Sequence, residues 1–449
     1  MPRVGAWLDS LHAAVRDAME RHGVPGVALG LIDDGREHVA GFGLASADGP
    51  HPVDGETIFQ VASITKTVVA TALLRLVERG ALALDAPLAR DLPGLRLRDP
   101  STTERLTLTH LLTHTGGFQG DVRDGAYGIR CGEGDDALAR FVEVVAHLPQ
   151  HAPPGELWFY NNAGFLIAGR AIEVATGLTF EAAIAELVLA PLGMRRSGFR
   201  PPAGQPVAVG HRIRDGRVEA EPDWLLPRRV NPAGGLLCPA DDLLRYARFH
   251  LGDGRAASGE RLLAPASMAL MRRPRVADAL HNGCLASFAD EVGLSWFSRG
   301  TPGGRLLVHG GWTSLAHRLT LVPERGLAVF VLTNAPTGAQ LHAELTKLVL
   351  RERAGIDGLD PVPLPAAPAD PARYAGTYRF VTPDVEDIVV RPAGERLELS
   401  EWGAAAFYAP DRIVALEGVW RHERGQFLRD PDGRMARLRM GGALGERIG

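Results

Sequence analysis

Residues 63–80 read SITKTVVATALLRLVERG, and this stretch decides the fold. Apolar side chains recur in it at helical spacing, and Gly80 can end the helix in a left-handed conformation. Because apolar positions surround most of the helix, the pattern is typical of a helix buried at the centre of a domain. These positions are Val68, Val69, Ala72, Leu73, Leu76 and Val77. We therefore predict a central buried helix whose first turn carries Ser63 and Lys66.

The elements on either side of this helix predict an α+β fold. Helical periodicity over 7–22 predicts an amphipathic helix, and two apolar runs around an Asp-Gly turn predict a β-hairpin over 26–43. Helical patterns broken by glycine and proline fill residues 100–300. Three strand patterns and a final helix follow, at 305–308, 317–322, 327–333 and 339–353. This order indicates an antiparallel sheet combined with helices.

A proline-rich stretch at 357–371 marks a domain boundary. Its five prolines remove backbone donors and fix φ, so neither a helix nor a central strand can form there. Short alternating segments separated by turns follow, and they predict a small all-β domain of about 75 residues. The predicted organisation is a large domain over 1–356, a linker over 357–371 and an all-β domain over 372–449.

Composition and charge are those of an ordinary globular protein, with 45% hydrophobic residues, 23% charged residues and a net charge of −4. Because basic clusters are missing, we expect no nucleic-acid partner. No apolar run reaches the roughly 18 residues that a membrane span needs. The first residues lack the pattern of a secretory signal, so we expect a cytoplasmic protein without a membrane partner.

The sequence offers no pattern of a metal or redox site, and we expect no cofactor and no metal. The three cysteines, Cys131, Cys238 and Cys284, lie far apart, so we expect them to be reduced and buried. His110 and His114 have the i, i+4 spacing of a zinc-binding helix but lack the glutamate of that motif. We interpret both histidines as structural.

Ser63 and Lys66 are the first candidates for catalysis. Side chains three positions apart lie on one face of a helix, so the lysine amine can reach the serine hydroxyl. A serine nucleophile needs a proton acceptor, and a lysine can serve once burial lowers its pKa from about 10.4. Of the 49 lysine and arginine residues, only Lys66 and Lys347 are lysines. An arginine could not take this role, because the guanidinium group stays charged.

Two further motifs follow in the chain. Tyr160-Asn161-Asn162 has the form Tyr-x-Asn, and His309-Gly310-Gly311 ends a predicted strand. Together with Ser63-x-x-Lys66 they resemble, in the same order, the three motifs of the penicillin-recognising serine enzymes. That family contains penicillin-binding proteins, class C β-lactamases, and related esterases and D-amino-acid peptidases.

The resemblance extends over residues 10–350, because the segments 111–117 and 231–236 also look like recurrent segments of the family. It implies a β-lactamase/transpeptidase-like catalytic domain, in which an antiparallel sheet is flanked by helices and joined to an all-helical lobe. The linker and the C-terminal strands resemble the small all-β, lipocalin-like domain that some members carry.

The resemblance also implies roles for single residues. Ser63 would attack an acyl carbon, while Lys66 and Tyr160 would share proton transfer from the serine and to the leaving group. Asn162 would hold Lys66 and hydrogen-bond the substrate. The backbone N–H groups of Ser63 and Trp312 would form the oxyanion hole.

The third motif departs from the form usual in β-lactamases. His309 takes the place of a lysine and Gly310 that of a threonine, and in the family those two side chains receive a substrate carboxylate. A largely neutral imidazole and a missing hydroxyl would weaken that anchor, which favours neutral esters, amides or thioesters. Gly310 and Gly311 would let the substrate backbone approach the strand closely.

Three functions stay open on the sequence. The first is a serine hydrolase that acts through a Ser63 acyl-enzyme on an ester, an amide or a D-amino-acid-containing peptide. The second is an acyltransferase or a peptide-cyclising thioesterase of the penicillin-binding-protein type. The third is a non-catalytic acyl sensor or binding module. The expected partner is a small-molecule or peptidyl acyl substrate, and assembly into a homo-oligomer is left open.

Overall fold

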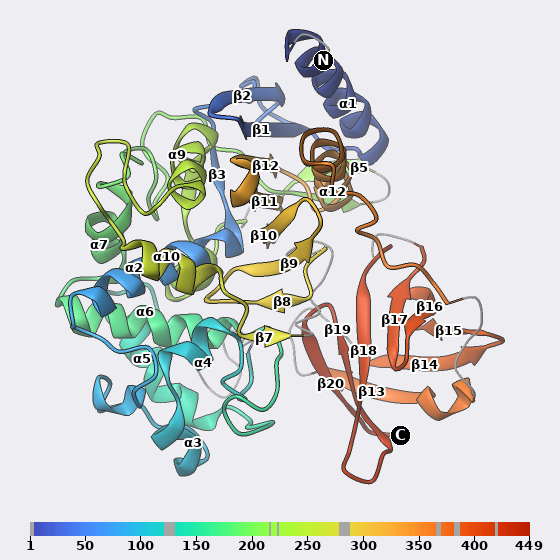
Figure 1. Ribbon diagram of the computed structural model, residues 1–449. Coiled ribbons are helices and arrows are strands. Elements are labelled where there is room, and N and C mark those ends of the chain that lie inside the picture. The colour runs from blue at the N-terminus through green and yellow to red at the C-terminus, as the bar shows by residue number, and fades with distance from the viewer. Residues whose placement is uncertain are drawn as a thin grey trace.

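The computed structural model describes residues 4–120, 131–214, 217–221, 224–277, 288–364, 370–380, 387–417 and 421–449. These residues form two parts (Figure 1). The larger part has a central sheet between helices, and the smaller part is a barrel of strands, coloured orange to red.

The larger part is built on an eight-stranded sheet whose neighbouring strands are all antiparallel. In spatial order the strands are β2 (Arg36–Gly43), β1 (Gly26–Asp33), β12 (Leu327–Thr333), β11 (Ala316–Val322), β10 (Gly304–Trp312), β9 (Phe297–Thr301), β8 (Glu291–Val292) and β7 (Val276–Ala277). The predicted hairpin is β1–β2, and its turn places Asp34 and Gly35 at φ of 51° and 73°. The predicted antiparallel sheet is confirmed.

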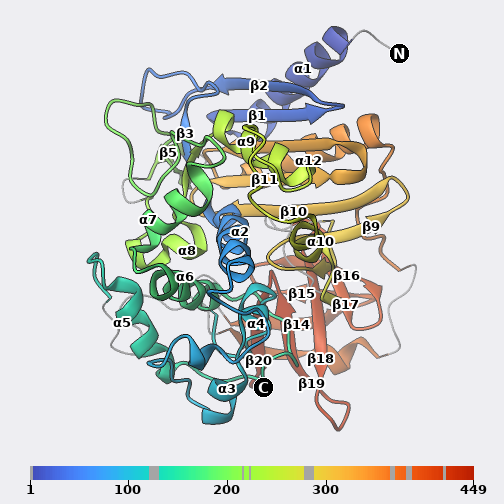
Figure 2. The same cartoon turned by 60° about the vertical axis from the view of Figure 1, so that its left-hand side comes forward.

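Helices cover both faces of this sheet, as Figure 2 shows from a second side. Side chains alternate across a strand, so a strand with both faces covered needs apolar residues at every position. In β12, Leu327, Val329 and Val331 belong to the core with α1 and α12, whereas Ala328, Phe330 and Leu332 belong to the core with α2 and α9. These helices are α1 (Val4–His22), α12 (Gly338–Val349), α2 (Thr65–Glu78) and α9 (Ala240–Leu251).

The predicted central helix is α2, and eleven of its 14 residues are buried. A single turn of 3-10 helix, Ala62–Ile64, leads directly into it, and Gly80 follows its end at φ of 72°. Further helices pack around α2 and form the all-helical lobe. They are α3 (Pro100–Arg105), α4 (Leu108–Leu112), α5 (Ala137–Val144), α6 (Asn162–Thr176), α7 (Phe180–Ile184), α8 (Asn231–Gly234) and α10 (Pro265–Arg272).

One helix in this lobe is shorter than the apolar pattern in its sequence. The pattern covers 106–114, but α4 begins at Leu108 because the Thr107 hydroxyl accepts a hydrogen bond from the His110 N–H, at 3.3 Å. His110 Nδ1 accepts the Thr107 N–H in return, at 3.2 Å, which completes a capping box. His114 lies beyond the helix at φ of 58°, so the two histidines do not share a helix face.

The C-terminal part is a closed eight-stranded antiparallel barrel, as the alternating pattern predicted in outline. Its strands are β13 (Gly376–Phe380), β14 (Ile388–Ala393), β15 (Arg396–Leu399), β16 (Gly403–Ala409), β17 (Arg412–Ala415), β18 (Arg424–Arg429), β19 (Met435–Met440) and β20 (Ala443–Arg447). Pairing of β20 with β13 closes it. Its own core, with Tyr374, Tyr378 and Phe427 at the centre, fills the interior.

Two short strand pairs complete the described structure. They join β3 (Ile58–Gln60) to β6 (Leu237–Pro239) and β4 (His211–Arg214) to β5 (Arg217–Ala220). Cys131 and Cys238 are buried thiols that form no disulfide within the described residues, and Cys284 lies outside those residues. Within the described ranges, no helix is both long enough and apolar enough to cross a membrane.

Candidate active site

Ser63 and Lys66 lie in contact at the entrance to α2. The Lys66 Nζ donates a hydrogen bond to the Ser63 Oγ at 2.9 Å and another to the Ala233 carbonyl at 2.6 Å. The Lys66 side chain is fully buried. The contact therefore brings the hydroxyl within hydrogen-bond distance of a buried amine.

The backbone before the nucleophile is held in an unusual conformation. Ala62, directly before Ser63, has a φ of 47°, in the left-handed region that non-glycine residues rarely occupy. Such strain persists only where the surroundings fix it, and it is concentrated at functional sites. The surroundings here include β10, because a Cβ at Gly311 would lie 2.3 Å from the Val61 carbonyl oxygen and 2.8 Å from the Ala62 Cβ.

The glycine at 311 therefore brings the end of β10 against the turn that carries Ser63. Trp312, the last residue of β10, lines the same cavity as Ser63. Gly310, the residue before Gly311, pairs with Arg318 of β11 in the sheet. The sequence predicted a close approach of substrate to this strand end, and the structure shows that Gly311 is also required by the protein's own packing.

Tyr160 lies on the other side of Lys66. The Lys66 Nζ is 4.8 Å from the centre of the Tyr160 ring, and the ring itself stacks on His114 with 4.4 Å between ring centres and 28° between planes. The His114 Nδ1 also accepts the backbone N–H of Asn161, at 3.0 Å. His114 thus supports both the Tyr160 ring and the backbone that follows it.

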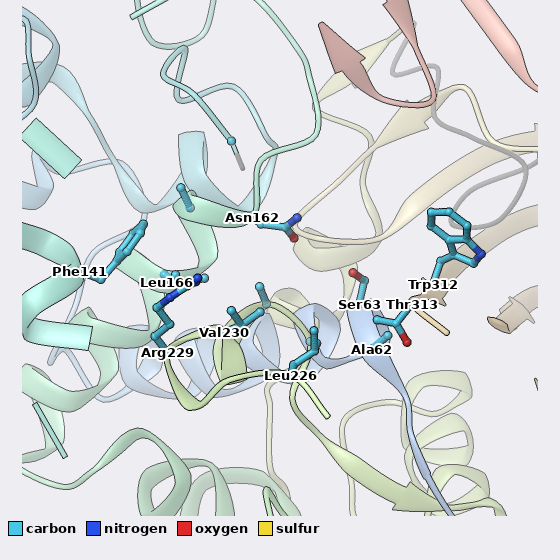
Figure 3. A pocket seen from close by; sticks show the side chains of 14 residues that line it. Ala62, Ser63, Phe141, Asn162, Leu166, Leu226, Arg229, Val230, Trp312 and Thr313 are labelled. Carbon is cyan, nitrogen blue, oxygen red and sulfur yellow. The ribbon is translucent and has the colours of Figure 1, made fainter. Parts of the chain in front are cut away.

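The Tyr-x-Asn motif ends at the start of α6. The Asn161 side chain caps this helix by accepting the Gly164 N–H at 2.7 Å, so α6 begins at Asn162. Asn162 lines the cavity, and its amide group is directed toward Ser63 in Figure 3.

His309 is fully buried in β10 and its imidazole is neutral at physiological pH. The His309 Nδ1 lies 2.7 Å from the Gly310 carbonyl oxygen, so that nitrogen carries the proton. Burial is the largest cause that lowers the pKa of His309, to about 3. This position therefore supplies no positive charge to a substrate, in contrast to the lysine of the usual motif.

A cavity of about 470 Å³ opens beside Ser63 (Figure 3). Its described lining is mostly small or apolar, and Arg229 is the one charged side chain in it. In Figure 3 the Arg229 guanidinium lies beside Leu166, at the end of the cavity away from Ser63 and Trp312. The 14 lining residues are Ala62, Ser63, Gly120, Phe141, Asn162, Ala163, Leu166, Leu226, Arg229, Val230, Ala233, Gly234, Trp312 and Thr313.

Two contributors to the site escaped the sequence analysis. The Ala233 carbonyl, which accepts from Lys66, belongs to the segment 231–236 that the resemblance marked without a role. The segment is held in place because the Asn231 side chain donates to Glu181 at 2.7 Å. His114 was interpreted as merely structural; its ring contact with Tyr160 gives it a direct bearing on the site.

The described residues contain no group of three or more His, Cys, Asp or Glu side chains that could hold a metal ion. The fold brings together the Ser63 hydroxyl, the Lys66 amine and the Tyr160 ring. All three come from the motifs at 63–66 and 160–162.

Comparisons with known proteins show the family of this chain. Residues 11–354 match the Beta-lactamase family. Penicillin-binding protein 4 of Amycolatopsis lactamdurans is 36% identical over 370 residues, which cover 80% of this chain and 93% of the relative. Esterase EstB of Burkholderia gladioli is 36% identical over 233 residues, which cover 45% of this chain and 59% of the esterase.

The solved structure of SurE matches with a TM-score of 0.77 and 28% identity, covering 99% of this chain and all of SurE. The larger part of the molecule thus has a β-lactamase/transpeptidase-like fold, and a separate eight-stranded barrel follows it. The chain belongs to the Beta-lactamase family, whose fold serves serine hydrolases.

Proposed function

We propose that this protein is a serine hydrolase that forms an acyl-enzyme on Ser63. The observation that carries the proposal is the 2.9 Å contact between the Lys66 Nζ and the Ser63 Oγ, with the amine fully buried. A serine becomes a nucleophile when a base within hydrogen-bond reach removes its proton, and this contact supplies that geometry.

In the proposed acylation, neutral Lys66 takes the proton from the Ser63 Oγ while that oxygen bonds to the substrate's carbonyl carbon. The carbonyl oxygen becomes an oxyanion, which the N–H groups of Ser63 and Trp312 would stabilise. Tyr160, adjacent to Lys66, passes a proton to the leaving oxygen or nitrogen as its bond to the acyl carbon breaks. Asn162 orients the substrate from the wall of the cavity.

Deacylation reverses these roles. A water molecule attacks the Ser63 ester and gives a proton to the Tyr160 phenolate left by acylation, while the Ser63 oxygen leaves and takes back its proton from Lys66. The products are a free acid and the resting enzyme. The apolar cavity wall supports an acyl group with apolar substituents, because burial of such a group in it is favourable.

The neutral His309 predicts which substrates react well. A short-chain p-nitrophenyl ester should be turned over with a kcat/KM at least about tenfold above that of a chromogenic cephalosporin, because one charge-assisted hydrogen bond to a carboxylate contributes about 1.5–3 kcal/mol. Steady-state kinetics of both substrates at pH 7 measure the ratio.

The Ser63→Ala variant serves as the control and should turn over neither substrate above the rate in buffer. A kcat/KM that is higher for the cephalosporin would contradict the ester preference. Turnover of the ester by Ser63→Ala would contradict the proposed nucleophile itself.

A second candidate is acyl transfer to an amine in place of water. The structural similarity to SurE favours this candidate, because a structure of SurE with D-Leu matches 99% of this chain with a TM-score of 0.76. An amine that reached the Ser63 ester would attack its acyl carbon, break the bond to the Ser63 oxygen and carry the acyl group away as an amide. Product analysis with added D-leucine separates the two: hydrolysis gives the free acid, whereas transfer gives the D-leucine amide.

A further inference from the structure

The barrel touches the active-site loop that carries Tyr160. In Figure 1 it lies beside the end of the large sheet that carries β8 and β7. The backbone N–H of Tyr160 donates to the carbonyl oxygen of Gly442, at 2.9 Å. The Arg439 Nη1 donates to the carbonyl oxygen of Trp158, at 2.8 Å. The loop from Trp158 to Tyr160 is thus held by two residues more than 270 positions further along the chain.

The two barrel residues belong to one tight hairpin. Met440 pairs with Ala443 across the turn between β19 and β20. The turn residues Gly441 and Gly442 have φ of 58° and 83°, as a type I′ turn requires. This rigid turn fixes the direction of the Gly442 carbonyl, which points out of the barrel to Tyr160.

Arg439 is buried at the contact between barrel and loop. It is 5% exposed, and its guanidinium carbon lies 5.1 Å from the centre of the Trp158 ring. The Arg439 Nη2 donates to the Gln426 side chain within the barrel, and this second bond fixes the orientation of the planar guanidinium group. Arg439 thus ties the Trp158 ring and its carbonyl to the barrel wall.

Trp158 in turn belongs to the aromatic cluster that surrounds Tyr160. The Trp158 ring packs edge-on against Phe297, with 6.1 Å between centres, and against His114, with 6.4 Å. Phe297 and His114 both stack on the Tyr160 ring, with 6.5 Å and 4.4 Å between centres. A shift of Trp158 would therefore be passed to Tyr160 by ring contacts as well as through the backbone.

The helical lobe holds the same loop from its other side. The Asn161 N–H donates to His114, and the Asn161 side-chain amide donates to the Phe118 carbonyl at 2.7 Å. These bonds restrain the loop after Tyr160, whereas the barrel bonds restrain it at and before Tyr160. Both supports are needed to define the position of the ring, because the segment from Trp158 to Asn161 belongs to no helix or strand.

We propose that the barrel is part of the catalytic apparatus, with Arg439 and the Gly441–Gly442 turn as positioning residues that fix Tyr160 for proton transfer. This inference rests on the proposed function, because it assigns a purpose to Tyr160. It gives the barrel a role in the chemical step, in addition to any role in holding substrate.

The test uses substrates that differ in their leaving group. p-Nitrophenolate leaves readily without a proton, whereas the alkoxide of an ethyl ester needs one. Arg439→Met should lower kcat by at least about tenfold on a p-nitrophenyl ester and by a further tenfold on the matching ethyl ester, with KM changed less than kcat. A merely structural role would lower both activities by the same factor.

A double-mutant comparison shows whether Arg439 acts through Tyr160. In a Tyr160→Phe background, Arg439→Met should cause no further loss, because the group that it positions is already gone. Losses that multiply in the double variant would overturn the proposal, and so would an Arg439→Met variant with wild-type kcat on both esters.

Arg429→Met is the matched control, because Arg429 lies in β18 and bonds Asp411 within the barrel, at 2.9 Å. It should retain wild-type kcat on both esters. The kcat of Arg439→Lys should be at least about threefold higher than that of Arg439→Met, because an ammonium can still donate one hydrogen bond to the Trp158 carbonyl. If Arg439→Met does not fold, Arg439→Lys takes its place in the same comparison.

Failure of this inference and failure of the proposed function give different results. If Ser63→Ala loses all ester turnover while Arg439→Met keeps wild-type leaving-group dependence, only the role of the barrel is wrong. If Ser63→Ala keeps turnover, the proposed function is wrong.

Discussion

Replacement of Lys66 by arginine is expected to lower the rate of acylation by about 10³-fold or more, because loss of a general base typically costs 10²–10⁴-fold and the new group cannot act as one. The Lys66 Nζ contacts the Ser63 Oγ at 2.9 Å, and a guanidinium placed there stays protonated. The arginine always carries a positive charge at this position, so the experiment separates a base from a cation that only orients the serine. Pre-steady-state acylation by a p-nitrophenyl ester measures the effect.

The chain offers a matched control, since Lys347 is its one other lysine. Lys347 lies on α12 and pairs with Asp360 at 2.6 Å, remote from the cavity. Lys347→Arg should acylate at the wild-type rate. Acylation of Lys66→Arg at more than about a tenth of the wild-type rate would contradict the assignment of Lys66 as the base.

A methyl group added at Gly311 should lower kcat/KM by about 10²–10³-fold, which is the typical cost of one lost oxyanion-hole donor. The added Cβ would lie 2.3 Å from the Val61 carbonyl oxygen, which is backbone and cannot rotate away. The end of β10 would therefore move from the Ser63 turn, and Trp312 would move with it. Ester kinetics of Gly311→Ala measure the loss.

Gly94→Ala is the control for this substitution, because the added Cβ would meet no atom within 4 Å there. It should keep wild-type kcat/KM. If Gly311→Ala were as active as Gly94→Ala, the contact between β10 and the nucleophile turn would not be needed for catalysis.

Much of the fold follows from local pattern. The helix at 63–80 was predictable because its apolar positions repeat at helical spacing, and α2 lies where that pattern predicts, with its first turn in the 3-10 form. The hairpin at 26–43 was predictable from its Asp-Gly turn. The strands β7, β8 and β9 escaped prediction, since two of them have only two residues and carry no measurable alternation.

The candidate site was predictable only where its residues form motifs. Short spacings within each motif revealed Ser63, Lys66, Tyr160 and Asn162. Ser63 and Tyr160 lie beside the buried Lys66 amine, and Asn162 lines the cavity. His309 is a buried, neutral side chain of β10.

Contacts between distant segments left no such signal. Ala233 accepts the Lys66 hydrogen bond through its backbone carbonyl, so its side chain gives no sign of this role. Arg439 looks like any other arginine in a chain where 47 of the 49 basic residues are arginine. Its contact with Trp158 depends on how the barrel docks, which no local pattern encodes.

The central claim is that Ser63 takes up the acyl group of the substrate and then loses it to water. The most direct measurement is mass spectrometry of the protein after a fluorophosphonate probe, with peptide mapping of the wild type and of Ser63→Ala. We predict one adduct, located on the peptide that contains Ser63 in the wild type and missing from Ser63→Ala. An adduct on a different serine, or equal labelling of both proteins, would contradict the account.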